Sequence, residues 1–400
     1  MAWKDLVSFD KSLIDKNLFD TLNYAREHTA FGRDHIPARF DIKDAKNILE
    51  SLPLVTSADL ANNLDYYISD KFNKFNSYTT TTGGTGRNPT MILLSNELYG
   101  IEWAHVHHIW AVAGYDRRRD VKLTLRGKSF KGDKLCEYNP LYNELVVDVF
   151  KIKSDNFPQL LEEIKKYAIK YIHGYPSLVK EYMVYFQKYH YMPRLKGILL
   201  ASEGVSVEDK RQMSEFFGCK VLSFYGQSER ALIAADFDGN DMHRVYTSYG
   251  YPRVVNGELV ITSFVNRALP LINYQIGDGA EIIEDDHYLY LKNLTSRRGK
   301  DFVYLTKDKK ISTAAINLHS PIQGEILYYQ IHQKEFGKIE IRVLQKKTSI
   351  VPAEHLLKVF GDEMKANLKE FEVTVRIVHE DEIVKSHRGK MILLVQELNV

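Results

Sequence analysis

The stretch Val221-Leu-Ser-Phe-Tyr-Gly-Gln-Ser-Glu229 is an apolar run that stops at a cluster of tyrosine, glycine and polar residues. Two earlier stretches follow the same plan, Ile172-His-Gly-Tyr-Pro-Ser-Leu178 and Ile198-Leu-Leu-Ala-Ser-Glu-Gly204. A short apolar run bounded by turn residues predicts a buried strand, and a helical pattern usually follows such a run here. Repeated strand-then-helix units predict a largely parallel or mixed α/β sheet, whose ligands lie at the carboxyl ends of its strands.

The regions on either side of these units have different patterns. Residues 1–75 carry apolar positions at three- and four-residue spacing, which predicts a mostly helical region. Thr56 and Ser57 are both candidate N-caps for a helix beginning near 58–60. Polar residues concentrate over 295–301, which we interpret as a linker. Beyond it, strand patterns and one helical pattern over 355–368 predict a second, smaller α+β domain.

The segment over 97–113 alternates apolar and polar residues at helical period. Its aromatic side either packs in the core or contacts a ligand. No acidic or cysteine residue stands at ligand spacing, so we do not expect metal binding there. This segment carries the histidines and the tryptophan His105, His107, His108 and Trp110.

Residues 121–125 alternate like a half-buried strand, and 145–150 form a β-branched apolar run typical of a fully buried one. A basic triplet, Arg117-Arg118-Arg119, precedes the first of these strands. The triplet is either a solvated edge or a binding site for a substrate phosphate.

The composition is that of an ordinary globular protein. The 400 residues are 44% hydrophobic and 26% charged, and this length exceeds a single core of about 100–200 residues, so we expect two domains. A formal net charge of +2 argues against a dedicated nucleic-acid binder. Cys136 and Cys219 supply no four-cysteine zinc site, and their usage fits a reducing cytoplasm. No apolar run of 18 residues or signal peptide is evident, so we expect a soluble cytoplasmic protein without a membrane partner.

A loop rich in threonine and glycine, Tyr78-Thr-Thr-Thr-Thr-Gly-Gly-Thr-Gly-Arg-Asn-Pro-Thr90, precedes the apolar stretch 91–94. Glycines let backbone N–H groups turn toward an anion, and hydroxyls add further donors, so the loop is suited to hold phosphate. It lacks the Gly-Lys-[Ser/Thr] ending of the familiar strand-loop-helix nucleotide motif. Taken alone, it is equally compatible with a flexible surface turn.

Short motifs along nearly the whole chain, in this order, resemble those of the adenylate-forming superfamily, specifically its phenylacetate–coenzyme A ligase-like branch. That branch includes proteins associated with capsular-polysaccharide synthesis. The motifs are Leu52-Pro-Leu-Val-Thr56, the threonine-glycine loop, Gly174-Tyr-Pro-Ser177, Tyr225-Gly-Gln-Ser-Glu229, Tyr274-Gln-Ile-Gly-Asp278, Arg298-Gly-Lys-Asp301 and Gly389-Lys390.

The resemblance implies an α/β fold in two parts. A large N-terminal domain with mixed β-sheets flanked by helices, residues 1–297, would bind ATP and the acid. A hinge at 298–301 would connect it to a small mobile α+β lid domain, residues 302–400. The chain departs from the family pattern at Ser57, which replaces a lysine, and at the loop ending, where Arg87 is the remaining nearby charge. No cysteine-rich zinc insertion is present, so no metal beyond Mg²⁺ is implied.

The resemblance also implies a nucleotide site. Residues Thr82, Gly83, Gly84, Thr85 and Gly86 would hold the β- and γ-phosphates of ATP. The following residues would complete the site: Tyr225 and Gly226 at the adenine, bordered by Ser202, Glu203 and Gly204; Ser228 at the α-phosphate; Asp278 at the ribose hydroxyls; Arg298 at the ribose or α-phosphate; and Glu229 as the Mg²⁺ ligand. A carboxylate suits the role of Glu229 because Mg²⁺ takes oxygen ligands, and it suits the role of Asp278 because ribose hydroxyls need acceptors. For Glu229 an exposed acid at a helix start is the alternative, and for Asp278 a turn-forming role.

Lys390 is the implied catalytic lysine, and it reaches the α-phosphate only when the lid closes. A cation delivered at closure stabilises the transition state without holding ATP in the open state. Lys300 occupies the place of the hinge residue about which the lid rotates between two half-reactions. A solvated terminal lysine in a basic cluster is the alternative interpretation of Lys390.

We therefore expect an ATP-dependent ligase that activates a carboxylic acid as an acyl-adenylate and passes the acyl group to an acceptor, by default coenzyme A. The alternatives are transfer to an amine, such as an amino sugar or amino acid, and a nucleotide-binding protein without turnover. Candidate walls of the acid pocket are His107, Trp110 and Tyr175, which suit a flat aryl or moderately apolar acid. A core role for each of the three stays open.

Overall fold

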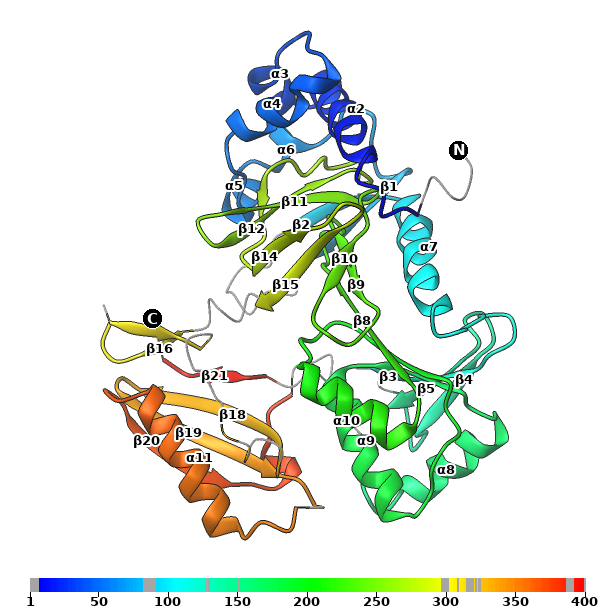
Figure 1. The fold of residues 1–400 in the computed structure, drawn as a ribbon, viewed down its shortest axis with the longest axis vertical. Coiled ribbons are helices and arrows are strands. Elements are labelled where there is room, and N and C mark those ends of the chain that lie inside the picture. Colours follow the sequence, from blue (N-terminus) through cyan, green and yellow to red (C-terminus); the bar gives the residue numbers. More distant parts are fainter. Residues whose placement is uncertain are drawn as a thin grey trace. The chain divides into compact units, whose positions relative to one another are not determined.

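The computed structural model describes residues 7–81, 91–126, 128, 130–149, 151–295, 302–307, 309–313, 320, 322, 325–347, 349–385 and 392–398. The chain folds into two compact units (Figure 1). Unit 1 comprises Met1–Gly114 and Leu222–Leu294, and unit 2 comprises Tyr115–Val221 and Thr295–Val400.

Short helices make up the N-terminal part of unit 1, as the spacing of apolar residues predicted. They are α2 (Leu13–His28), α3 (Ala30–His35), α4 (Ala45–Ser51), α5 (Ser57–Asn62) and α6 (Leu64–Tyr67), with the 3-10 turn η1 (Ile42–Asp44). Of the two candidate N-caps, Thr56 is confirmed, because its Oγ1 accepts a hydrogen bond from Asp59 N at 3.2 Å, whereas Ser57 is the first residue of the helix. Thr56 N donates in return to Asp59 Oδ2 at 2.8 Å. This reciprocal pair satisfies amides that the first helical turn leaves without partners.

Three sheet segments complete unit 1 together with helix α7 (Leu98–Ala111). Strands β1 (Ser77–Thr81) and β2 (Met91–Ser95) form an antiparallel pair. A second segment has the order β14-β15-β10-β9-β8, and a third has the order β11-β12-β13. Their bounds are β8 (Lys220–Gly226), β9 (Ile233–Asp236), β10 (His243–Val245), β11 (Gly250–Val255), β12 (Glu258–Ser263), β13 (Tyr274–Gln275), β14 (Gly279–Glu284) and β15 (Leu289–Thr295).

Unit 2 contains a mostly parallel sheet segment of order β7-β6-β3-β5-β4, in which only β4 runs antiparallel to its neighbour. A helix follows β6 and another follows β7, as the sequence pattern predicted. Apolar side chains of these helices and strands form one core. The elements are β3 (Lys122–Arg126), β4 (Cys136–Asn139), β5 (Glu144–Asp148), α8 (Phe157–Lys166), β6 (Tyr171–Gly174), α9 (Pro176–Lys188), β7 (Gly197–Leu200) and α10 (Val207–Phe217).

Strand β3 differs from its predicted half-buried state, because Lys122 and Thr124 are as buried as the apolar residues between them. Both polar side chains find a partner on the adjacent strand. Glu144 Oε2 lies 3.3 Å from Lys122 Nζ and accepts a hydrogen bond from Thr124 Oγ1 at 2.8 Å. The polar positions that suggested a solvated face therefore belong to a buried polar cluster. The arginines at 117–119 are exposed, which favours the solvated edge for them.

The C-terminal part of unit 2 is a small sheet of order β20-β19-β18-β21. Helix α11 runs along one face of this sheet and packs its apolar side against it (Figure 1). The elements are β16 (Phe302–Tyr304), β17 (Lys310–Ser312), β18 (Ile326–Glu335), β19 (Lys338–Gln345), α11 (Ala353–Asn367), β20 (Glu372–Ile377), the 3-10 turn η5 (Glu380–Glu382) and β21 (Leu394–Gln396). The fold is thus of the predicted class, a mixed α/β fold with a large mixed sheet and a small C-terminal sheet.

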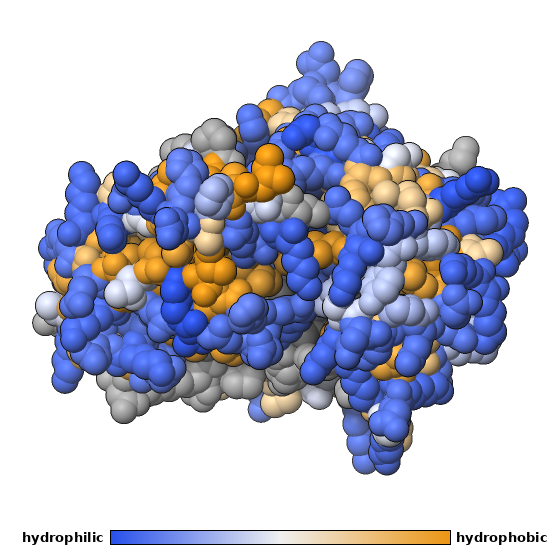
Figure 2. All heavy atoms as spheres, turned by 90° about the horizontal axis from the view of Figure 1, so that it is seen from below, coloured by the Kyte–Doolittle hydropathy of each residue, from blue (hydrophilic) through white to orange (hydrophobic). Residues whose placement is uncertain are grey.

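Polar side chains cover much of the face seen in Figure 2, with groups of apolar side chains between them. Within the described part of the chain, none of the helices has both the length and the apolar character that a membrane span requires.

Candidate active site

A tight turn follows β8 and reverses the chain into β9. Gln227 Oε1 accepts hydrogen bonds from the backbone N–H groups of Ala231 and Leu232 at 3.3 and 3.2 Å. Arg230, the last residue of the turn, has a φ of 50°, which is a left-handed conformation that L residues rarely adopt. Sparsely populated backbone conformations of this kind are often retained at functional sites. The motif Tyr225–Glu229 therefore occupies a fixed turn at the end of β8.

Glu229 is 2% exposed, so its carboxylate is buried in unit 1. Tyr274 OH, which is also buried, donates a long hydrogen bond of 3.4 Å to Glu229 Oε1. A buried carboxylate is costly unless polar groups compensate it. The exposed helix-start acid, which was the alternative for Glu229, does not agree with this burial.

Tyr225 and Asp278 are 53 residues apart in sequence, and their side chains meet. Tyr225 OH donates to Asp278 Oδ2 at 2.7 Å. Burial and the adjacent charge of Asp278 raise the pKa of Tyr225 well above its usual value, so the phenol remains a donor. Two of the predicted nucleotide residues are thereby brought together.

The N-terminal motif also lies against this region. Val55 N donates to Asn273 O at 3.0 Å, and Gln275 N donates to Val55 O at 2.8 Å. The side chain of Asn273 adds a bond from Nδ2 to Leu52 O at 3.1 Å. The segment at 52–56 thus forms a backbone bridge on either side of Tyr274 and fixes the start of the Tyr274–Asp278 motif.

Arg230 forms a cluster that sequence reasoning missed. Its Nε lies 2.8 Å from Glu102 Oε2 on α7, and its Nη1 donates to Tyr78 OH on β1 at 2.5 Å. The guanidinium is also 5.8 Å from the ring centres of Tyr78 and Tyr99, which adds a cation–π contribution. The cluster ties β1, which leads into the threonine-glycine loop, to the turn of Glu229. The position of Arg230 directly after Glu229 in the sequence was the signal that could have indicated this cluster.

In unit 2 the Gly-Tyr-Pro-Ser turn contacts the Ser202–Gly204 motif. Ser177 N, in the Gly-Tyr-Pro-Ser turn, donates to Glu203 Oε2 at 3.2 Å. A Cβ at Gly174 would lie 2.4 Å from Leu125 O, so only glycine fits there. Ser202 has a φ of 69°, again a left-handed conformation. Tyr175 packs against the core of this unit while remaining partly exposed.

The aromatic side of α7 contributes mainly to the core. Trp110 is 1% exposed, and His107 stacks on it with ring centres 5.6 Å apart. His105 is fully buried, its Nδ1 lies 2.8 Å from Ile101 O, and burial lowers its pKa to about 4. These contacts favour the core alternative for Trp110 and His105. The acid pocket proposed from His107, Trp110 and Tyr175 stays a prediction.

Several predicted site residues lie outside the described residues: Thr82, Gly83, Gly84, Thr85, Gly86, Arg298, Lys300 and Lys390. Their roles, and the hinge at 298–301, stay predictions. Among the described residues no group of three or more histidine, cysteine, aspartate or glutamate side chains is arranged to hold a metal ion.

Known proteins resemble this chain in sequence and in fold. Residues 100–266 match the family model described as AMP-binding enzyme. Protein CapK of Staphylococcus aureus is 22% identical over 312 residues, which cover 73% of this chain and 68% of that protein. A 2-hydroxyisobutyryl-CoA ligase in the postadenylation state, in complex with R3-HIB-AMP, superposes with a TM-score of 0.69 at 17% identity, covering 98% of this chain and 91% of that one. GH3.15 acyl acid amido synthetase reaches a TM-score of 0.59 at 13% identity, covering 94% and 87%. These similarities support the AMP-binding, adenylate-forming superfamily of AMP-forming ligases, with residues 100–266 matching its family model and CapK as a distant homologue.

Proposed function

We propose that the protein activates a carboxylic acid with ATP and transfers the acyl group to coenzyme A. In the first step a carboxylate oxygen attacks the α-phosphorus, and the bond to the β-phosphate breaks, which gives acyl-adenylate and pyrophosphate. In the second step the coenzyme A thiolate attacks the acyl carbonyl carbon and AMP leaves. Charge develops around the phosphates in the first step, so positioned donors and cations are needed there.

The observation that carries this proposal is the pair of Tyr225 and Asp278, joined at 2.7 Å in the same unit that buries Glu229. In the proposal Asp278 accepts from the ribose hydroxyls, Tyr225 lies against the adenine and Ser228 donates to the α-phosphate. Asp278 is only 8% exposed, so bulk water competes little with the ribose hydroxyls for its carboxylate oxygens.

Glu229 is the residue that would hold Mg²⁺. Its buried carboxylate offers the hard oxygen ligand that this ion prefers. Mg²⁺ usually keeps several water ligands and binds substrate phosphates, so one protein carboxylate is enough for such a site. When bound, Mg²⁺ neutralises charge on the leaving pyrophosphate. The chain's own part is to hold Glu229 in the turn after β8, where Gln227 fixes the backbone and Tyr274 contacts the carboxylate.

The remaining roles belong to residues of the two predicted domains, 1–297 and 302–400. The threonine-glycine loop would hold the pyrophosphate before it leaves, and Lys390 would approach the α-phosphate on the lid. Rotation about Lys300 would then withdraw Lys390 and admit the acceptor. Lys390→Ala should abolish adenylate formation while changing the dissociation constant of ATP far less, and comparable losses of both would overturn this role.

Transfer to an amine is the second candidate, and the fold similarity to an acyl acid amido synthetase supports it. The similarity to a coenzyme A ligase, at the higher TM-score, supports the thiol acceptor. Both candidates share the first half-reaction, which forms the acyl-adenylate. Only the product of the second half-reaction, a thioester or an amide, distinguishes them.

The proposal is tested by pyrophosphate release from ATP across a panel of aryl, fatty and amino acids, with and without coenzyme A or amines. Asp278→Asn should raise the KM for ATP and lower release, and the matched control Asp133→Asn, at an exposed position, should leave both unchanged. Thioester formation supports coenzyme A as acceptor, and amide formation independent of coenzyme A supports the amine. Absence of release with every acid contradicts the proposal and favours a nucleotide-binding protein without turnover.

A further inference from the structure

Unit 1 contains a small cavity at the end of its sheet where a hairpin joins β9 to β10. The volume of the cavity is about 240 Å³, below the range of about 300–1,000 Å³ that is typical of sites for drug-sized ligands. The wall is half apolar or aromatic and half polar or charged, so a small ligand with both characters fits it. The lining residues are Phe237, Met242, Ile283 and Tyr290, together with Asp238, Asn240, Arg244 and Asp285.

The cavity lies away from the residues proposed to bind the nucleotide. Tyr225 pairs with Ala234 on β9, whereas the cavity residue Phe237 follows Asp236, the last residue of that strand. Strand β9 therefore runs from the turn of Glu229 to the cavity. Its four residues span roughly 10 Å at a rise of about 3.3 Å per residue. The cavity is thus distinct from the proposed nucleotide site.

A buried carboxylate fixes the hairpin that forms one wall. Asp236 is fully buried, and it accepts hydrogen bonds from the backbone N–H groups of Asp238 at 3.1 Å, Gly239 at 2.8 Å and Asp241 at 3.1 Å. Gly239 has a φ of 74°, which favours glycine. Asp241 Oδ2 also accepts from Asn293 N at 3.1 Å, which ties the hairpin to β15. The wall is therefore preformed.

Arg244 supplies the positive charge of the wall. It lies on β10 opposite Tyr290 of β15 and interacts with the phenol group of that residue. Its guanidinium carbon is 4.1 Å from the ring centre of Tyr288, and 5.4 and 5.6 Å from those of Phe9 and Phe237, so cation–π contacts fix it. Its Nε is buried without a hydrogen-bond partner. Within the described part of the chain, no carboxylate forms an ion pair with this guanidinium.

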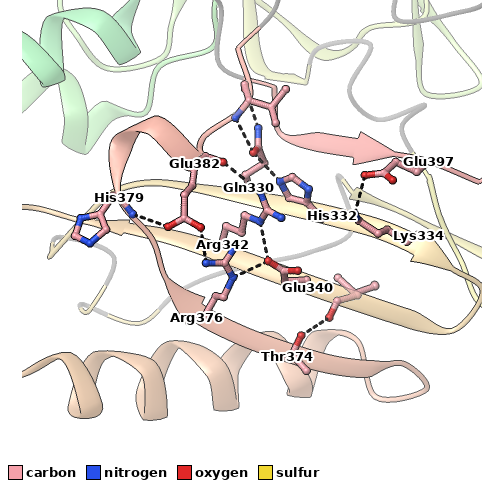
Figure 3. A network of polar contacts seen from close by, with 12 residues as sticks. Gln330, His332, Lys334, Glu340, Arg342, Thr374, Arg376, His379, Glu382 and Glu397 are labelled. Carbon is pink, nitrogen blue, oxygen red and sulfur yellow. Dashed lines mark hydrogen bonds and ion pairs between the residues drawn. The ribbon is translucent and has the colours of Figure 1, made fainter. Parts of the chain in front are cut away.

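Two other arginines show the contrast. Figure 3 shows Arg342 and Arg376 on the C-terminal sheet, where both donate through Nε to Glu340 Oε1, at 2.7 and 2.8 Å. Arg376 Nη1 also donates to Glu382 Oε2 at 2.7 Å. Acids of the chain thus balance both of these cations. Arg244 instead has aromatic rings around it, and a partly buried cation without an acid partner favours an anionic ligand.

The two acids of the wall are used differently. Asp285 Oδ1 accepts from His287 N at 2.8 Å and Tyr288 N at 2.7 Å, and its Oδ2 accepts from Tyr290 OH at 2.9 Å. Burial and the hydrogen bond to Asp285 raise the pKa of Tyr290, so this phenol stays a donor. Asp238 is exposed, and no cation among the described residues pairs with it. Its carboxylate is therefore available to a positive group of a ligand.

We propose that this cavity binds a small zwitterion, an α-amino acid with an aliphatic side chain. Arg244 binds the carboxylate of this ligand, and Asp238 binds its ammonium group. Phe237, Met242 and Ile283 contact the aliphatic side chain. The wall carries one cation and two acids, which disfavours a phosphate dianion. The inference does not rest on the proposed function, because none of these residues has a role in activating the acid.

The test titrates the whole chain, without ATP, with three ligands of related carbon skeleton and follows binding by ligand-observed NMR. L-Leucine carries both charges, 4-methylpentanoate lacks the ammonium group and 3-methylbutylamine lacks the carboxylate. We expect the Kd of L-leucine to be about tenfold below that of either comparator, because each comparator loses one charge-assisted contact. Equal affinities of the three ligands, or no binding of L-leucine, would overturn the proposal.

Two variants assign the charges. Arg244→Met should weaken binding of L-leucine and 4-methylpentanoate about tenfold and leave 3-methylbutylamine unchanged. Asp238→Asn should weaken L-leucine and 3-methylbutylamine about tenfold and leave 4-methylpentanoate unchanged. The matched controls are Arg376→Met, whose guanidinium has acid partners, and Asp286→Asn, at an exposed position outside the cavity wall. Both controls should keep all three Kd values.

The melting temperature of Arg244→Met is measured first, because Arg244 also packs against aromatic rings. If this variant does not fold, the exposed position of Asp238→Asn still decides the outcome. Unchanged binding of L-leucine in Asp238→Asn would place the ligand elsewhere, such as in the acid pocket of the active site, and would contradict the proposal. Since binding is measured without ATP, the result is independent of whether the protein releases pyrophosphate.

Discussion

Two partly buried charge clusters, one in each unit, connect elements that are far apart in sequence, but they balance charge differently. In unit 1, Arg230 meets one acid, Glu102, at 2.8 Å. In unit 2, Lys385 meets two acids, Glu181 and Glu380, at 3.3 and 3.7 Å. In the first cluster burial raises the pKa of Glu102 and the charge of Arg230 opposes this shift. In the second cluster two acids share one lysine, and burial of Glu181 beside Glu380 favours retention of a proton. The two clusters therefore differ in the number of acids that each cation has to balance.

Removal of Arg230 should have the largest effect. Arg230→Met leaves Glu102 without its cation and releases Tyr78 on β1, so we expect the free energy of unfolding to fall by about 3 kcal/mol. Urea unfolding measures this loss. The double variant Arg230→Met, Glu102→Gln should regain part of it, and absence of any recovery would contradict the pairing.

Removal of Lys385 should have a smaller effect, because Glu181 can compensate by keeping a proton. We expect Lys385→Met to lower the free energy of unfolding by about 2 kcal/mol at pH 7. Lys369→Met is the matched control, since Lys369 is an exposed lysine of the same unit. A similar loss in both variants would show that the ion pairs of Lys385 contribute nothing specific.

The pH dependence separates the two clusters. Burial, and the carboxyl of Glu380 beside it, raise the pKa of Glu181 from 4.5 to about 8, while Lys385 opposes the shift. Tyr185 OH donates to Glu181 Oε1 at 3.0 Å. Burial opposes ionisation of Glu380, but its hydrogen bond with Glu181 and the charge of Lys385 lower its pKa. The folded state therefore holds a proton that the unfolded state has lost. Stability should decline by up to about 1.4 kcal/mol per pH unit as the pH rises from 6 toward 8.

Glu181→Gln should flatten this part of the pH profile, because the amide is neutral throughout. Chemical unfolding between pH 6 and pH 9 measures both proteins. A slope that persists in Glu181→Gln would assign the titration to another group.

The smallest effect is expected at Tyr78. Tyr78→Phe removes the hydroxyl that accepts from Arg230 but keeps the ring, so we expect a loss of about 1 kcal/mol in the free energy of unfolding. Thermal unfolding measures it against Tyr99→Phe, whose ring is at the same distance from the guanidinium. An equal change in both variants would mean that the hydrogen bond to Arg230 is not important.

The sequence predicted the parts of the fold that depend on local pattern. Apolar runs ending in turn residues indicated β6, β7 and β8, and the cap at Thr56 followed from residue type and spacing. Burial of β3 was not predictable, because the partner of Lys122 and Thr124 lies on a strand 20 residues away. Contacts between distant residues have no local signature.

The same limit applies to the site. The motifs identified Tyr225, Glu229 and Asp278 individually, and their order indicated a nucleotide site. The links to Glu102 and Tyr78 through Arg230 join residues that only the fold brings together. Sequence reasoning proposed residues for contact with the nucleotide and missed the contacts that hold these residues in place.

The most direct test of the central claim is the identity of the products formed from ATP. The wild-type protein, incubated with ATP and an accepted carboxylic acid, should release AMP and pyrophosphate in equal amounts after acyl transfer, as measured by phosphorus NMR. Formation of ADP and inorganic phosphate would contradict the assignment of carboxylate attack to the α-phosphorus.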